Sequence, residues 1–327
     1  MRKSVFHEDW WLDALAPGGW REVTCSRGGR VVGSLRFVTR TEGGMNICEM
    51  PQITRFLGPT VTLQSGKTEA RMRLAHAVIT DLLKQVADFD HVEMTLDTGF
   101  SDVAAFLACG YEVRAHPTFM LKCTIPRDEL WSGLRDKTKN VIRRARERLA
   151  IREVTSPKYF VKYYQANLEG AKSYFDLSRL EAVYAAASER QQCRILAAVD
   201  SNNNVHAQVF FVWDHKFVHY FLSSRDRSIA HPGAVSLLLW SGIELAHERG
   251  LHFDFDGGIE NEARYKFVVA FGGELANRFD VSRSTTRYRL HRQLRRVPQA
   301  LLRRLSAGAA TGDVNDHGGR LNHFPSS

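Results

Sequence analysis

The same order of local structural signals occurs twice along this chain of 327 residues. In each half, two strand-like runs joined by a short turn precede an amphipathic helix and a further strand. In the first half, Gly28-Gly29 separates the two strand-like runs. In the second half, a helix over 233–249 stops at Gly250, and a strand over 251–255 follows. This order predicts two copies of one α/β unit.

The repeat sets the expected domain boundaries. We predict an N-terminal domain over 1–130, a C-terminal domain over 131–282 and a separate tail over 283–327. The clearest strands are expected at 20–27, 30–40, 91–96, 194–199, 205–213 and 217–223, and further helices at 69–87, 134–148 and 157–170.

The tail carries nearly all of the net charge of +9. Between Arg283 and Arg304 there are eight arginines and no acidic residue, and leucines recur on one face of the expected helix. A basic amphipathic helix over 283–305 predicts contact with an anionic membrane surface or a partner, with packing on its own domain as the alternative. From residue 307 the composition predicts disorder.

Composition excludes several classes of protein. With 44% hydrophobic and 25% charged residues, the chain is typical of globular proteins. No apolar run is long enough to span a bilayer, and acidic residues near the N-terminus are unlike a signal peptide. Five scattered cysteines predict a reducing, cytoplasmic location. Neither a spaced cluster of metal ligands nor a GxSxG motif is present, so we expect no metal and no serine nucleophile.

A loop after the strand at 217–223 leads into the helix that begins at Gly233. The first turn of a helix has unpaired N–H groups and a positive dipole, which attract phosphate. Ordinary helix-start packing explains proline and glycine here equally well. The candidate phosphate-binding residues are Arg225, Arg227, His231, Gly233, Ala234 and Val235.

Polar residues also follow the next strand, where open α/β sheets usually bind ligands. Asp254 and Asp256 end this strand, and Tyr265 and Lys266 begin a short helix. The alternatives are a turn residue for Asp256 and a solvated surface charge for Lys266.

The helix at 134–148 is strongly basic and includes Lys139 and Arg143. It is expected to bind a phosphorylated acceptor or an RNA, or to form a solvated face.

Four segments in order resemble FemAB-like proteins of the GNAT acyltransferase superfamily, which often carry two tandem GNAT-like domains. They are MPQITRFLGP at 50–59, AHPTFMLKC at 115–123, LRDKTKNVIRRARER at 134–148, and DFDGG followed by ARYKFVVAFGGE in 254–274. The resemblance implies an α/β fold of two such domains, each a mixed, mostly antiparallel sheet flanked by helices.

The resemblance also implies a reaction. The family moves an acyl or aminoacyl group from a thioester or a tRNA ester to an amine, so we expect direct transfer from acyl-CoA to an amino sugar, a peptide or a cell-envelope precursor. Transfer from aminoacyl-tRNA, or a non-catalytic RNA- or membrane-binding module, is the alternative. On this interpretation the enzyme is cytoplasmic, or peripheral on the inner face of the membrane.

The resemblance assigns roles to the candidate residues. Arg225, Arg227, His231, Gly233, Ala234 and Val235 would contact the donor phosphates. Tyr220, Asp254 and Asp256 would position or deprotonate the amine, and Lys266 would neutralise an oxyanion or a phosphate. Lys139, Arg143 and Tyr265 would contact the acceptor.

Overall fold

Strands form where β-branched and aromatic residues concentrate, and these stretches pair into one extended sheet. The structure is a computed structural model that describes residues 4–62, 66–100, 102–168, 175–256 and 262–296. The strand order is β1-β2-β3-β5-β12-β6-β11-β10-β9-β8-β7, and β4 pairs with β2. The strands are β1 (Trp20–Arg27), β2 (Arg30–Glu42), β3 (Met45–Glu49), β4 (Thr60–Val61), β5 (His91–Leu96), β6 (Glu112–Leu121), β7 (Ala150–Glu153), β8 (Cys193–Val199), β9 (Val205–Trp213), β10 (Phe217–Arg225), β11 (His252–Asp254) and β12 (Glu274–Ser284).

The helices flank this sheet. They are the 3-10 helix η1 (Val5–His7) and the α-helices α1 (Asp9–Leu15), α2 (Thr68–Lys84), α3 (Ala104–Ala108), α4 (Arg127–Ser132), α5 (Asp136–Arg148), α6 (Pro157–Ala166), α7 (Ser178–Glu189), α8 (Ala234–Glu248), α9 (Glu262–Val269) and α10 (Thr286–Arg296). The predicted α/β class, with a mostly antiparallel sheet flanked by helices, is confirmed.

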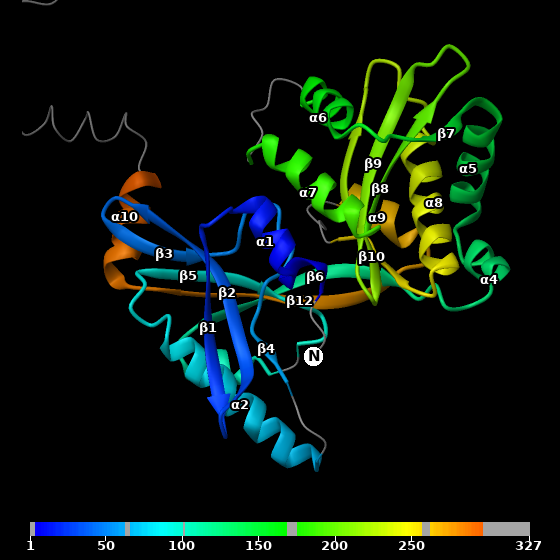
Figure 1. The fold of residues 1–327 in the computed structure, drawn as a ribbon. Helices are drawn as coiled ribbons and strands as arrows, with labels where there is room; N and C mark the ends of the chain where they lie inside the picture. The colour runs from blue at the N-terminus through cyan, green and yellow to red at the C-terminus, as the bar shows by residue number, and fades with distance from the viewer. Residues whose placement is uncertain (1–3, 63–65, 101, 169–174, 257–261, 297–327) are drawn as a thin grey trace, which may run out of the picture. The chain divides into compact units, whose positions relative to one another are not determined.

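In the second half, helices cover both faces of the strands β7 to β10 (Figure 1). Helices α5 and α8 pack on one face, in a core that contains Phe211, Trp240 and Phe253. Helices α6 and α7 pack on the other face, against Phe210 and Phe221. Strand β9 continues as the adjacent strand β10 through a tight turn, as predicted, and β10 pairs in parallel with β11.

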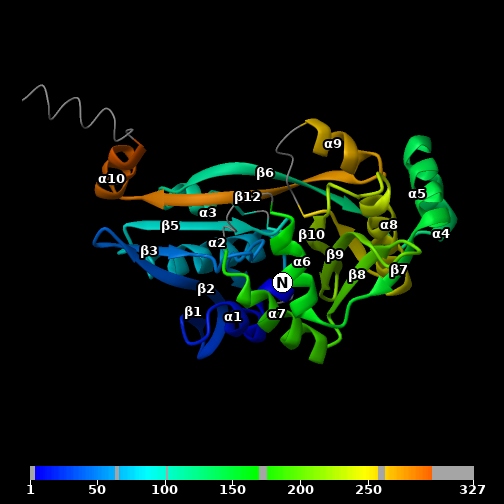
Figure 2. The same ribbon diagram turned by 90° about the horizontal axis from the view of Figure 1, so that it is seen from above.

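Strand β12, which the sequence analysis did not predict, joins the two halves. It comes from the end of the second half but lies between β5 and β6 of the first half. Its register with β6 runs from Glu274 opposite Met120 to Ser282 opposite Glu112. The two strands run side by side along the molecule (Figure 2). Side chains from both halves therefore meet on this part of the sheet.

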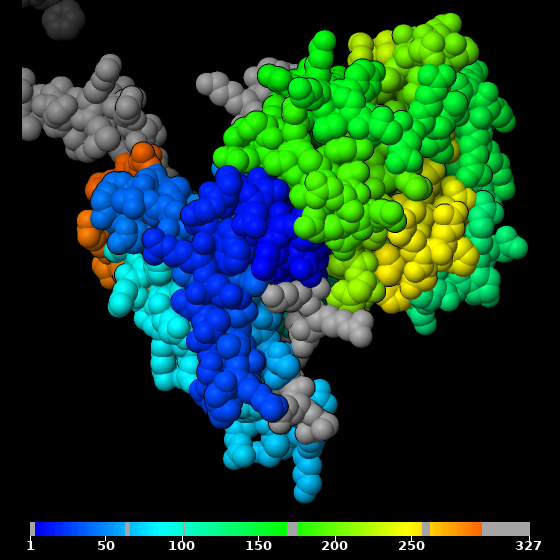
Figure 3. Space-filling view, viewed as in Figure 1, coloured from blue at the N-terminus to red at the C-terminus, as the bar shows by residue number. Residues whose placement is uncertain are grey.

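The N-terminal segment also connects the halves. Helix α1 contacts α7, and Phe6 and Trp11 share one core cluster with Phe210 and Phe221. The first described residues, in dark blue, lie directly against the second half in the space-filling view (Figure 3). The contacts divide the chain into Met1–Arg283 and Ser284–Ser327. The boundary predicted at residue 130 thus falls inside the first of these units.

In the second unit, the structure describes α10, which coincides with the start of the predicted basic helix. The remainder of that helix and the predicted disorder lie outside the described residues. Among the helices in the described ranges, none combines the length and the apolarity needed to cross a lipid bilayer.

Candidate functional site

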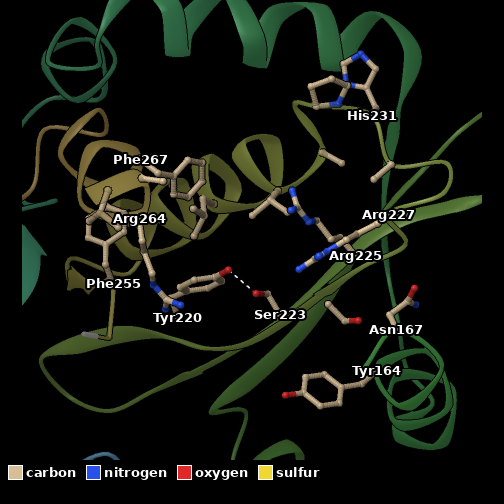
Figure 4. Close-up of a pocket in the computed structure, with 18 of the residues that line it drawn as sticks. Tyr164, Asn167, Tyr220, Ser223, Arg225, Arg227, His231, Phe255, Arg264 and Phe267 are labelled. Carbon is tan, nitrogen blue, oxygen red and sulfur yellow. Dashed lines mark hydrogen bonds between the residues drawn. The ribbon is translucent and has the colours of Figure 1, made fainter. Parts of the chain in front are cut away.

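A cavity of about 600 Å³ lies between the end of β10, the first turn of α8 and α9. We call it the large cavity. Most of the predicted phosphate-binding residues line it, namely Arg225, Arg227, His231, Ala234 and Val235, and so does the predicted catalytic residue Tyr220. Figure 4 shows these side chains together with Arg264, which reaches toward Tyr220 from α9.

Two histidines hold the loop between β10 and α8. The backbone N–H of His231 donates to Nδ1 of His206 at 3.0 Å, and the N–H of Gly233 donates to Nδ1 of His231 at 3.1 Å. A ring nitrogen that accepts an N–H carries a lone pair, so both rings are neutral in this arrangement. Burial, with the charges of Arg148 and His206, lowers the pKa of His231 in agreement.

Hydrogen bonds within the loop therefore occupy several backbone N–H groups before α8 begins. The N–H of Ala234 donates to the carbonyl of His231 at 3.0 Å, and Pro232 has no N–H. The amides of Val235 and Ser236, in the first turn, have no carbonyl four residues earlier inside the helix to pair with. They are the backbone groups of this turn that fit an anion in the large cavity.

Gly233 lies against helix α5, outside the lining of the large cavity. A Cβ at this position would lie 2.7 Å from the carbonyl oxygen of Val141 and 2.9 Å from Cβ of Ala145. Gly233 is absent from the cavity lining and instead allows α8 to approach α5 closely.

Replacing Gly233 with alanine should lower the free energy of unfolding by about 1–3 kcal/mol, because backbone of α5 must move to admit the methyl group. Urea denaturation followed by fluorescence measures this change. Gly66→Ala is the matched control, since nothing lies within 4 Å of its added Cβ. Equal stability of the two variants would contradict the packing role.

A second cavity of about 400 Å³, the small cavity, adjoins the first. The two cavities share Tyr164, Tyr220, Ser223 and Arg264. The remaining lining of the small cavity comes from both halves of the chain, namely Met50, Thr54, Arg55, Thr95, His116, Phe221, Leu222, Asp256 and Arg278. The two cavities thus offer neighbouring spaces for two ligands.

A buried ionic network forms one wall of the small cavity. Arg278 on β12 has a side chain only 2% exposed and pairs with Asp254 and Asp256, the latter at 3.0 Å. Asp256 also pairs with Arg55. Asp254 continues the network to His219, whose Nδ1 lies 3.1 Å from the carboxylate.

The network contains charged groups inside the core. Burial opposes the positive charge of His219, but hydrogen bonds and charges from Asp214 and Asp254 outweigh it and raise the pKa of His219 to about 9. Burial also opposes ionisation of Asp214, but His219 and two backbone N–H groups lower its pKa to about 2. For Asp254, Arg278 and His219 overcome burial and lower the pKa. Carboxylates and cations therefore alternate along the network at neutral pH.

Two residues beside Arg55 have unusual backbone conformations. Asp256 has φ of 57° and Ile53 has φ of 59°, in the left-handed region that β-branched residues avoid. Asp256 keeps this conformation because Arg278 and Arg55 hold its carboxylate and its N–H donates to Asp254 at 2.9 Å. Such strain concentrates at functional sites.

Tyr220 lies where the two cavities meet. Its hydroxyl donates to Oγ of Ser223 at 2.5 Å, the contact drawn in Figure 4. Burial raises the pKa of Tyr220, although Ser223 and the charges of Arg264, Arg225 and Arg55 act in the opposite direction. Tyr220 is therefore a neutral hydroxyl surrounded by guanidinium groups.

Several predicted site residues lie elsewhere. Asp254 is fully buried and lines neither cavity. Tyr265 and Lys266 line a separate hollow of about 300 Å³, and Lys266 pairs with Glu262 at 2.7 Å. On α5, Lys139 pairs with Asp136 at 2.8 Å, and the guanidinium of Arg143 lies 5.5 Å from the ring of Trp131.

The sequence analysis did not propose as site residues four basic residues that line the cavities: Arg55, His116, Arg264 and Arg278. A signal existed for Arg264, because it directly precedes the predicted residues Tyr265 and Lys266 at the start of the same short helix. The others meet only through long-range pairing, which no local pattern reveals. Within the described ranges, no group of three or more His, Cys, Asp or Glu side chains could hold a metal ion.

Comparison with known proteins agrees with this architecture. The sequence profile of the GNAT acetyltransferase domain matches residues 136–266, which contain α5 to α8 and most of the large cavity. A search of curated proteins gave no match.

Solved structures share the fold over most of the chain. The crystal structure of FemX matches with a TM-score of 0.64 at 12% identity, over 84% of this chain and 91% of FemX. The C-terminal domain of a candidate lysylphosphatidylglycerol synthetase from Agrobacterium fabrum matches with a TM-score of 0.56 at 13% identity, over 90% of this chain and 92% of that one. The match to the GNAT acetyltransferase domain and the FemX-like fold support the resemblance found in the sequence, and residues 136–266 form a GNAT acetyltransferase domain.

Proposed function

We propose that this protein is an N-acyltransferase that moves an acyl group from acyl-CoA to an amine acceptor by direct attack. The observation that carries the proposal is the pair of adjoining cavities, one lined by guanidinium groups beside a helix N-terminus. On this proposal the large cavity holds the donor and the small cavity holds the acceptor.

The charges in the large cavity support a phosphorylated donor. Arg225 extends from the end of β10, Arg227 from the loop that follows and Arg264 from α9 (Figure 4). Within the described part of the chain, no carboxylate lies within ion-pair distance of Arg225, so its charge is available to a ligand. Guanidinium groups and first-turn amides together are well suited to a pyrophosphate. Apolar side chains such as Phe255 and Leu239 line the same cavity and suit the remainder of the donor.

The small cavity supports a polar acceptor. Its lining mixes hydroxyl, imidazole, carboxylate and guanidinium groups from both halves of the chain. One relative by fold is the C-terminal domain of a candidate lysylphosphatidylglycerol synthetase. An amino sugar, a peptide or another cell-envelope precursor with a primary amine is the acceptor class that we propose.

Acetyl-CoA, or an acyl-CoA with a longer chain, should stabilise the protein against thermal unfolding. At 100 times its dissociation constant, a ligand of the native state adds about 2.7 kcal/mol. The Arg225→Ala variant should bind the donor about 10- to 100-fold more weakly, because a charge-assisted contact is lost. Arg114→Ala is the control, since Arg114 is exposed, pairs with Glu112 and lines neither cavity.

Two results would contradict the proposal. The first is thermal stability that no acyl-CoA changes. The second is an absence of amine-dependent thiol release from acyl-CoA with amino sugars and peptides as acceptors.

Aminoacyl-tRNA is the alternative donor, and the basic α5 favours it. The guanidinium groups of Arg143 and Arg146 lie 5.5 and 5.7 Å from the ring of Trp131, which presents a positive, aromatic surface. Steeply salt-dependent tRNA binding together with aminoacyl transfer would favour this donor over acyl-CoA. The same RNA binding without any transfer would favour a non-catalytic module.

We also propose that α10 places the enzyme on an anionic membrane surface at the cytoplasmic side. Leu290 and Leu294 are 55% and 64% exposed on this helix, whose other residues are mainly basic. Vesicles containing anionic lipid should bind the full chain and release it at high salt. Unchanged binding after deletion of 284–327 would contradict this assignment.

A further inference from the structure

A histidine in the small cavity is held by a carboxylate in the manner of a catalytic base. Nδ1 of His116 on β6 lies 3.0 Å from Oδ2 of Asp280 on β12. The hydroxyl of Thr95 on β5 donates to the other oxygen of Asp280 at 2.7 Å. His116 and Thr95 line the small cavity, and the side chain of His116 is 38% exposed.

The hydrogen bonds define which nitrogen of His116 carries a proton. Burial opposes ionisation of Asp280, but His116, Thr95 and the charge of Arg278 lower its pKa. An ionised carboxylate only accepts hydrogen bonds, so Nδ1 of His116 must be the donor. In the neutral ring, Nε2 therefore carries the lone pair. Within the described part of the chain, no protein group is hydrogen-bonded to this Nε2.

We propose that His116 is the general base that deprotonates the acceptor amine, and that Asp280 positions its ring. This inference rests on the proposed N-acyltransferase function. The amine nitrogen bonds to the carbonyl carbon, and the carbon–sulfur bond breaks with its electron pair on sulfur. The ammonium loses two protons in total: Nε2 of His116 accepts one and passes it to water, and the other ends on the thiolate.

The other candidate bases in this region are already engaged. Asp256 pairs with Arg55 and Arg278, and the hydroxyl of Tyr220 donates to Ser223. The charged groups of the small cavity are Arg55, Asp256, Arg264 and Arg278, and Asp280 lies behind the imidazole. His116 lies opposite Arg278 in the strand register, so its imidazole stands beside the charged wall of the small cavity.

The test compares two kinds of acceptor, with acetyl-CoA as donor and thiol release as the readout. The first is a primary amine that the wild-type protein acetylates, chosen from glucosamine, ethanolamine and a lysyl dipeptide. Such amines are largely protonated near neutral pH and need a base. The second is hydroxylamine, which is uncharged at neutral pH and does not need one.

His116→Gln should lower kcat for the primary amine by about 100-fold or more, the typical contribution of general base catalysis. It should lower kcat for hydroxylamine by less than about tenfold, and leave acetyl-CoA binding and thermal stability unchanged. The rising limb of the pH profile of kcat/KM should also disappear. His91→Gln is the matched control, because His91 pairs with Glu93 in the same sheet but lines neither cavity.

Asp280→Asn tests the positioning role. This variant should lower kcat for the primary amine without changing KM. The value of kcat for hydroxylamine should again change less than that for the primary amine. Equal losses of activity with both acceptors, or no loss with either, would overturn the assignment of His116 while leaving the transferase intact. A wild-type protein that neither binds acetyl-CoA nor releases thiol with any amine would overturn the proposed function and the base with it.

Discussion

Replacing Arg278 with leucine should lower the free energy of unfolding by about 3–5 kcal/mol, because one partner of a buried ionic network is removed. The Arg278 side chain is 2% exposed and holds the carboxylates of Asp254 and Asp256. In the variant, Asp254 still pairs with His219, and Asp256 still pairs with Arg55. His219 also pairs with Asp214, so two cationic side chains remain for three buried carboxylates. The variant should also lose activity, since Asp256 and Arg278 form one wall of the small cavity.

Urea denaturation of the full chain measures the change. Arg40→Leu is the control, because Arg40 also pairs with two carboxylates, Glu42 and Glu49, but is 44% exposed. Exposed ion pairs contribute up to about 1 kcal/mol, so this variant should unfold almost as the wild type does. A loss below about 1 kcal/mol for Arg278→Leu would contradict the expectation that the buried network stabilises the fold more than an exposed ion pair does.

Alkaline pH should destabilise the protein through His219. The pKa of this residue is raised from 6.5 to about 9 in the folded state. The stabilisation by its proton is complete below about 6.5 and is lost as the pH rises through about 9. Within that interval, the free energy of unfolding should fall with a slope approaching about 1.4 kcal/mol per pH unit.

The other groups with shifted pKa values act outside this interval. Burial lowers the pKa of His231 and His252, so these residues affect stability at pH values below about 6.5. Burial raises the pKa of the Cys48 and Cys123 thiols to about 12. These thiols therefore affect stability only from about pH 9 upward, since 9 is the ordinary pKa of a thiol. Urea denaturation between about pH 6.5 and pH 9 therefore reports on His219. The His219→Gln variant should be less stable but lack this slope, and a flat wild-type profile would contradict the protonated state of His219.

Local patterns predicted the second half of the fold well. Val205–Trp213 forms β9 within the predicted limits, and the predicted helix at 233–249 is α8. Strand β12 was missed because its residues alternate weakly between buried and exposed positions and follow a short helix. Helix α7 was missed as well, since the tertiary contact with α1 supplies much of its packing.

The candidate site shows the same difference between features set by local sequence and features set by long-range contacts. The loop and first turn of α8 are contiguous in sequence, so the positions of Arg225, His231 and Val235 around the large cavity followed from local reasoning. The small cavity joins residues as distant as Arg55 and Arg278, which only the sheet order brings together. Gly233 shows a further limit of local reasoning. A side chain at this position would collide with α5, and the sequence around Gly233 does not reveal that contact.

The position of β12 has a consequence for synthesis of the chain on the ribosome. Strands β5 and β6 are complete by residue 121, but the strand that belongs between them begins only at residue 274. At about 5–20 residues per second, translation reaches it roughly ten to thirty seconds later. During that delay the nascent chain carries two unpaired strand edges, which are open to wrong partners. The first half therefore cannot complete its native topology cotranslationally until almost the whole of the second half has been made.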